Sequence, residues 1–308
     1  MRKFTAAFFV AALLCAALPL SAHEGPEHEI EELTERMKRN GETAELLTER
    51  AVEYRVLGKL PEATKDLELA LTYAPDSVGA HCELARVFFL GGKANEALTT
   101  IVRGLTVKTD DTSDYAALRM LRAEIFRSQN EHKKALEDCD TGLRLYKANP
   151  EWYLLRSDVQ RRLKMHQERI AGLEDGIRET GAGILEIERI EAQMDAGQWA
   201  AAFKIIETEL DDSRIKSSWL IRRARAFIGL GKRTEADVDL KAAMEEISAR
   251  IDPKNPDVPL LLDKALIYEM LGEKKDALRA YEEARDKGAA DGVNDKIKAL
   301  KELLPKTN

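Results

Sequence analysis

The sequence predicts an all-α protein, an α-solenoid made of stacked helical hairpins, and three observations indicate this fold class. Aromatic residues make up 6% of the chain, whereas Ala, Leu, Glu, Lys and Arg are plentiful, a composition that favours helices over strands. Five segments repeat one arrangement of small and aromatic residues at identical spacing. A residue that tolerates left-handed backbone follows at the same distance in each of them.

The bulk composition limits the class of protein. The chain has 308 residues, of which 44% are hydrophobic and 33% are charged, so it contains enough apolar side chains for a folded core. Its formal net charge of −7 argues against a nucleic-acid partner, because proteins that bind nucleic acid usually carry a strong basic excess. We therefore expect a folded protein that binds no nucleic acid.

The amino-terminal segment, residues 1–22, has the layout of a secretory signal peptide. Arg2 and Lys3 precede an apolar run over residues 4–20, and the small pair Ser21-Ala22 follows this run. We expect cleavage after the pair and export of the mature chain to the periplasm or cell envelope of a bacterium. The alternative is an uncleaved segment that tethers a membrane-bound assembly factor.

Two cysteines, Cys82 and Cys139, remain after such a cleavage. Cys139 falls on the predicted core face of its helix, and Cys82 lies on a different helix. A disulfide needs two Cβ atoms about 4 Å apart, which helices separated by an intervening helix do not provide. We therefore expect two free thiols, with Cys139 buried.

The repeated arrangement consists of a small residue followed by an aromatic residue three positions later and by small residues 12 and 19 positions later. Its five occurrences are Ala51, Tyr54, Ala63 and Ala70; Ala85, Phe88, Ala97 and Gly104; Ala123, Phe126, Ala135 and Gly142; Ala224, Phe227, Ala236 and Ala243; and Ala265, Tyr268, Ala277 and Ala284. The residues seven positions after the first small residue are Gly58, Gly92, Asn130, Gly231 and Gly272. Matches at identical offsets predict one structural unit that recurs along the chain.

These offsets predict a helical hairpin. The first small residue and the aromatic residue lie one turn apart on the same face of a first helix. The following glycine ends that helix, because it adopts left-handed backbone at little cost. Small residues spaced by one heptad on the second helix allow two helix axes to approach closely, and Pro61 fits in the first turn of such a helix. The alanines thus mark the seams between packed helices.

The pattern resembles the tetratricopeptide repeat, because the period between Ala51 and Ala85 is 34 residues and the family has an Ala-x3-Phe step and a trailing proline. Pro75 matches the trailing proline. The step is matched here by Ala63/Leu67, Ala97/Ile101, Ala135/Cys139, Ala236/Leu240 and Ala277/Tyr281. The resemblance implies a right-handed superhelix whose first helices line the concave side.

The repeats divide the chain into about seven predicted units. The clear units are 44–77, 78–111, 116–149, 217–250 and 258–288, and the degenerate units are 150–183 and 183–216. Ser157 and Ile190 take the first small position of the degenerate units, and Arg169 is a poor match at a second small position.

Each end of the repeat array carries an additional predicted segment. A His- and Glu-rich segment, 23–43, precedes the units and contains a lone amphipathic helix over 27–39 with charges all round. A capping helix and tail, 289–308, follow the units. Val293, Ile297 and Leu300 form the apolar face of this helix, which a solenoid needs in order to cover its last hairpin.

Motifs of catalysis are missing from the sequence, which has no Gly-rich phosphate loop and no H-E-x-x-H, C-x-x-C or G-x-S-x-G pattern. We therefore expect no enzyme activity, no cofactor and no small-molecule partner. His23 and His28 are the candidate metal ligands, because cleavage would leave His23 with a free amine beside its imidazole. They support an alternative function, a periplasmic metal-handling protein, although a flexible acidic tail is the simpler interpretation.

The resemblance also implies a partner-binding surface on the concave face. The family's inward-facing positions correspond here to Arg55, Arg86, Phe89, Met120, Arg127, Leu154, Arg161, Arg162, Ile187, Ile221 and Arg225. Arginine pairs with carboxylates while its stem contacts apolar surface, so this face suits an acidic or extended segment of another protein. The alternative is that the arginines pair with glutamates on adjacent helices.

The family's carboxylate clamp, which has Lys and Asn at set inner positions, is not matched, because Thr48 and Val52 stand where it would begin. We therefore do not expect capture of a free peptide carboxyl terminus by that route. The predicted function is a non-enzymatic scaffold or adaptor that binds a partner segment on its concave face.

Overall fold

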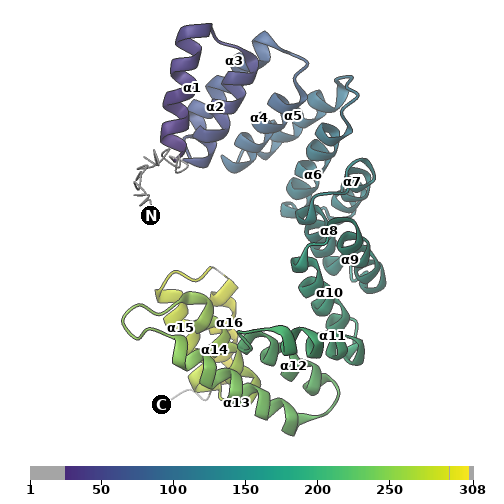
Figure 1. The fold of residues 1–308 in the computed structure, drawn as a ribbon, viewed down its shortest axis with the longest axis vertical. Helices are drawn as coiled ribbons and strands as arrows, with labels where there is room; N and C mark the ends of the chain where they lie inside the picture. The colour runs from purple at the N-terminus through teal and green to yellow at the C-terminus, as the bar shows by residue number, and fades with distance from the viewer. Residues whose placement is uncertain (1–24, 291, 305–308) are drawn as a thin grey trace, which may run out of the picture. The chain divides into compact units, whose positions relative to one another are not determined.

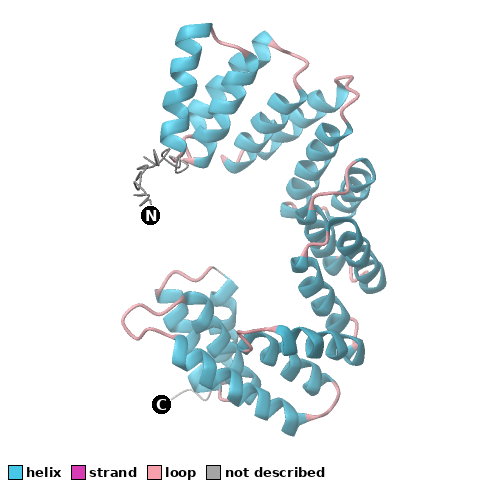
Figure 2. Cartoon of the chain, viewed as in Figure 1, coloured by secondary structure: helices cyan, strands magenta, loops and turns pink. Residues whose placement is uncertain are grey.

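The computed structural model describes residues 25–290 and 292–304, and these residues form sixteen α-helices and no strand, as Figure 1 and Figure 2 show. The helices are α1 (Pro26–Asn40), α2 (Ala44–Val56), α3 (Leu60–Tyr73), α4 (Val78–Leu90), α5 (Ala94–Thr106), α6 (Thr112–Ser128), α7 (His132–Leu145), α8 (Pro150–Arg162), α9 (His166–Thr180), α10 (Gly183–Asp195), α11 (Trp199–Asp212), α12 (Ser217–Gly229), α13 (Arg233–Arg250), α14 (Val258–Leu271), α15 (Lys274–Asp286) and α16 (Gly292–Leu303). The predicted all-α fold class is confirmed. None of the described helices combines the length and the apolar character needed to cross a bilayer.

The chain forms two compact units, and the division between them falls within α6, between Ile125 and Phe126. In the first unit, α2 packs against α3 and α4, and α4 packs against α5. In the second unit, α8 packs against α9 and α10, α12 packs against α13, and α14 packs against α15. Helices therefore contact their neighbours in sequence, which is the arrangement of a solenoid.

The small residues that were predicted to mark helix seams are buried in all five sets. Each of their alanines has an exposed fraction of 0%, and Gly104 and Gly142 are buried as well. Gly104 shows why this position must be small, because a Cβ atom there would lie 2.8 Å from Cδ1 of Leu118 and 3.0 Å from Cβ of His81. The predicted close approach of the helices is confirmed.

The turn between the two helices of a hairpin uses left-handed backbone. The φ angles are 71° at Gly58, 75° at Gly92, 60° at Asn130, 76° at Gly231 and 82° at Gly272. The same offset from Ser157 and Ile190 leads to Lys164 and Gly197, whose φ angles are 57° and 72°. Lysine is rarely found in this region of backbone space, so the turn geometry persists where the sequence no longer favours it.

Helix α1 has one apolar face, as expected of an amphipathic helix, but it does not stand alone. It packs against α2 and buries Leu33 and Met37, each of which is 5% exposed. These residues are four positions apart, so they share one face of the helix. Arg50 of α2 adds a hydrogen bond from Nη1 to Oγ1 of Thr34 (3.0 Å).

Helix α16 covers the end of the last hairpin. Val293, Ile297 and Leu300 are buried in one cluster with Ala280 and Tyr281 of α15. The apolar face that the sequence predicted for this helix is therefore the face that packs against α15.

Candidate functional site

Two of the arginines predicted on the concave face join neighbouring first helices through glutamates. Arg55 of α2 donates from Nε to Oε2 of Glu83 in α4 (2.9 Å). Arg225 of α12 donates from Nη1 to Oε2 of Glu191 in α10 (2.7 Å). The structure therefore shows the pairing with carboxylates on adjacent helices that the sequence offered as the alternative.

Three further arginines of the predicted face donate hydrogen bonds to Asp158 on α8. Its carboxylate accepts from Nη2 of Arg161 (2.5 Å), from Nε of Arg162 (3.0 Å) and from Nη1 of Arg127 (3.3 Å). Burial raises the pKa of the Asp158 carboxyl, but the hydrogen bonds from Arg162 and Arg161 outweigh burial and hold the pKa below its ordinary value. This carboxylate is therefore charged and fully engaged at neutral pH.

Two of the predicted surface residues belong to the core, which corrects the sequence interpretation. Met120 is 3% exposed and Ile221 is 4% exposed, so neither can contact a partner. Both stand three positions before the first small residue of their unit, a place that faces the helix interface in these hairpins. Phe89 is partly buried against the core of the first unit, and Arg86 contacts Glu83 on its own helix (3.4 Å).

In the two degenerate repeats, the residue three positions before the first small position lines a pocket. Leu154 and Ile187 stand three positions before Ser157 and Ile190, and both are only half-buried. They line a pocket of about 530 Å³ together with Asp158, Arg161, Arg169, Ile184, Glu188, Glu191 and Asp195. The pocket therefore lies between α8 and α10, with a side chain of α9 beneath them.

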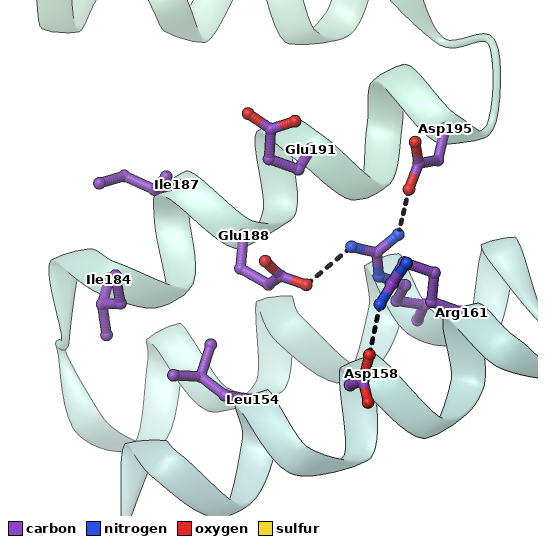
Figure 3. A pocket seen from close by; sticks show the side chains of 9 residues that line it. Leu154, Asp158, Arg161, Ile184, Ile187, Glu188, Glu191 and Asp195 are labelled. Atoms are coloured by element: carbon purple, nitrogen blue, oxygen red, sulfur yellow. Dashed lines mark hydrogen bonds and ion pairs between the residues drawn. The ribbon is translucent and has the colours of Figure 1, made fainter. Parts of the chain in front are cut away.

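Figure 3 shows that the pocket is divided into an apolar end and a charged end. The side chains of Leu154, Ile184 and Ile187 gather at one end, whereas Asp158 and Asp195 lie at the other. Leu154/Asp158, Ile184/Glu188 and Ile187/Glu191 are each spaced by one helical turn, which brings the two members of each pair to the same helix face.

Arg169 forms the floor of the pocket. Its side chain is 2% exposed and donates from Nη2 to Oε1 of Glu188 and from Nη1 to Oδ2 of Asp195, both at 2.7 Å. Its Nε donates to Oγ of Ser157 (2.9 Å), and that hydroxyl donates to Glu188 (2.8 Å). A buried guanidinium needs such partners, because an unpaired buried charge is costly.

Most of this site was not predicted from the sequence. Leu154, Arg161 and Ile187 were placed correctly on the first helices, but Arg169 was interpreted only as a poor match to a repeat. The available signal was the pair of polar residues, Ser157 and Arg169, at two positions that are alanine in the clear repeats. Two polar residues at adjoining core positions indicate a buried polar network, rather than a repeat that has merely lost its pattern.

The other candidate residues give no second site. Cys82 and Cys139 are both free, as expected, and Cys139 is buried as predicted; Cys82 is buried as well. His28 lies in the first turn of α1, whereas His23 and the predicted signal peptide lie outside the described residues. Within residues 25–290 and 292–304, no three His, Cys, Asp or Glu side chains are grouped so that they could hold a metal ion.

Paired helices, left-handed turns and buried small residues define this chain as an α-solenoid of helical hairpins. Among solved structures, a tetratricopeptide repeat protein from Parabacteroides merdae matches 89% of this chain and 98% of its own, with a TM-score of 0.60 and 18% identity. A chain of the APC/C hetero-tetramer Cut9–Hcn1 matches 89% of this chain and 46% of its own, with a TM-score of 0.55 and 13% identity. The chain therefore has the tetratricopeptide-repeat fold. No protein-family model and no curated protein sequence matches it.

Proposed function

We propose that the chain is a non-enzymatic scaffold or adaptor that binds a segment of a partner protein on its first helices, at the pocket between α8 and α10. The observation that carries this proposal is the pocket of about 530 Å³, which combines exposed aliphatic side chains with carboxylates. Ile184, at its apolar end, is 51% exposed. An aliphatic surface with a few placed polar groups is typical of a binding site.

The chemistry of the pocket favours binding over catalysis. Its carboxylates are held by arginine: Glu188 and Asp195 by Arg169, and Glu191 by Arg225. Each of these carboxylates already accepts a hydrogen bond from a guanidinium, which holds it in a fixed position. The paired groups are better suited to present fixed charge to a partner.

We place this activity in the periplasm or cell envelope, because residues 1–22 have the layout of a signal peptide. Amino-terminal sequencing of the chain recovered from the cells that produce it tests this part. Cleavage after Ala22 supports export. An intact first segment in the membrane fraction would support the tethered form instead.

Site-specific photo-crosslinking tests the binding surface in the cell. A benzoylphenylalanine introduced at Ile184 reports on the pocket, and the same substitution at Ile215, which is also 51% exposed but lies outside the pocket, is the matched control. We expect a discrete light-dependent adduct with a protein from position 184 and none from position 215. Adducts of equal yield from both positions would contradict the proposal.

A further inference from the structure

The geometry points to the chemistry of the partner: we propose that the pocket binds an extended segment that carries an aliphatic side chain and a lysine or arginine two residues away from it. The aliphatic side chain occupies the end formed by Leu154, Ile184 and Ile187, and the cation lies between Glu188 and Asp195. This inference rests on the proposed function and specifies its partner. It keeps the extended segment of the sequence analysis but gives it a basic residue in place of acidic ones.

Charge in the middle of the pocket gives the first reason for a cation. Arg169 supplies one positive charge, whereas Glu188 and Asp195 supply two negative charges, so this group carries a net charge of −1. The guanidinium is 2% exposed, but the side chains of Glu188 and Asp195 are 28% and 40% exposed. A ligand therefore meets the carboxylates and not the arginine, and an additional cation would balance the group.

Hydrogen-bonding capacity gives the second reason. Arg169 engages Oε1 of Glu188 and Oδ2 of Asp195. The other oxygen of each carboxylate, Oε2 and Oδ1, receives no hydrogen bond from the described residues. A charged carboxylate has only acceptor sites, so a ligand that approaches these oxygens must donate. Arg161 also lines the pocket and is 50% exposed, but it pairs with Asp158, so we assign the cation to the group of Glu188 and Asp195 and not to the side of Arg161.

The spacing of the two ends sets the separation of the two side chains. Ile184 and Glu188 are separated by one turn of α10, a rise of about 6 Å. Side chains on the same face of an extended peptide are two residues apart, which corresponds to about 6.6 Å. A peptide that runs along α10 would therefore place one side chain over Ile184 and the next on the same face beside Glu188.

Selection from a phage-displayed library of random 12-residue peptides on the immobilised full chain tests the inference, because random peptides favour no chemistry at the start. Affinities of the selected peptides are then measured by fluorescence anisotropy on four variants. Asp195→Asn removes one charge and keeps an oxygen for Arg169, and its control Asp140→Asn changes an aspartate of similar exposure that pairs with Arg156 outside the pocket. Ile184→Ser shortens the apolar end, and its control is Ile215→Ser.

We expect enrichment of an aliphatic residue and a lysine or arginine separated by two positions, in one of the two possible orders. Asp195→Asn and Ile184→Ser should each weaken binding by about tenfold, as the loss of one good contact does, and both controls should bind as the unchanged chain. Circular dichroism of each variant shows that the helices are retained.

The results that would contradict this inference differ from those that would contradict the proposed function. Acidic peptides that require Ile184 would overturn the inference and leave the pocket as a peptide site. Peptides selected for basic residues alone, displaced by spermidine and indifferent to Ile184→Ser, would show a general cation site and would overturn it as well. If every selected peptide binds all variants equally, the pocket is not the site, and the proposed function fails with the inference.

Discussion

The indole ring of Trp199 lies directly against the backbone of Gly229, so that a Cβ atom at this glycine would overlap Cδ2 of the ring. Trp199 begins α11 and Gly229 ends α12, and the contact fixes how the start of one helix meets the end of another. To relieve such an overlap, the indole ring must leave its position or the two helices must move apart, and either change disturbs the packing.

Gly229→Ala should therefore lower the free energy of unfolding by about 1–3 kcal/mol, the usual cost of overpacking. Urea unfolding followed by circular dichroism measures this change. Gly79→Ala in α4 is the control, since a Cβ atom there has nothing within 4 Å. The control should stabilise the protein by up to about 1 kcal/mol, because alanine is the better helix former. Equal responses at the two glycines would contradict a tight contact at Trp199.

The pairs Arg50–Asp66 and Arg223–Asp239 each join the two helices of one hairpin with the same sequence separation of 16 residues. In the second pair, Nε and Nη2 of Arg223 donate to the two oxygens of Asp239, both at 2.8 Å, and the aspartate is 6% exposed. These hydrogen bonds, partly offset by burial, raise the pKa of Arg223.

Asp239→Ala should destabilise the chain by about 1.5–3 kcal/mol, because it leaves the half-buried guanidinium of Arg223 without the two carboxylate oxygens that accept its hydrogen bonds. A double-mutant cycle with Arg223→Met isolates the pair, and urea unfolding supplies the four free energies. We expect the double variant to be more stable than Asp239→Ala alone. Simple additivity of the two changes would show that the pair contributes nothing.

The buried polar network beneath the pocket should make this part of the chain less stable than a clear repeat with alanine at the same positions. Arg169→Ala alone should cost about 2 kcal/mol, because Glu188 and Asp195 lose their shared partner. Combination of Arg169→Ala with Ser157→Ala, Glu188→Gln and Asp195→Asn restores alanine at both seam positions and removes the unpaired charges. This combined variant should recover most of the loss, since buried ion pairs are often no more stable than apolar packing. Thermal unfolding at neutral pH compares the variants, and a further loss in the combined variant would contradict this account.

The two buried thiols should be unreactive in the folded chain. Burial raises the pKa of Cys82 to about 11 and the pKa of Cys139 to about 12. The thiolate is the reactive form and an unperturbed thiol has a pKa of about 8.5, so both sites hold very little thiolate at pH 8. Iodoacetamide labelling at pH 8, read by peptide mass spectrometry, should modify neither residue in buffer and both in 8 M urea, in which roughly a quarter of each thiol is ionised. Rapid labelling of either residue in buffer would show that its helix opens readily.

The fold could be predicted from the sequence because a seam between helices imposes the same requirement in every hairpin. Ala51 and Ala265 have different neighbours, but both must be small, and a requirement that recurs at fixed spacing is visible in one sequence. The left-handed turn is visible for the same reason wherever glycine occupies it. Lys164 shows the limit, since its turn could only be inferred by counting from the neighbouring repeats.

The candidate site could be predicted only in part, because it depends on departures from the repeat. The transfer of family positions found Leu154 and Ile187, but the same offset also led to Met120 and Ile221, which are buried. An offset places a residue on a helix face, whereas exposure depends on how tightly the next helix packs. At the alanine seams the next helix covers this position, whereas beside Arg169 the position lines a pocket.

A ligand bound across α8 and α10 would also change how the second unit responds to heat. In an array of nearest-neighbour contacts, the least stable junction separates first, and the junction that contains Ser157 and Arg169 lacks the alanine packing of the clear repeats. A segment that spans both helices would hold this junction closed and raise the melting temperature as its occupancy increases. The junction that departs from the repeat pattern would then be the one that the partner stabilises.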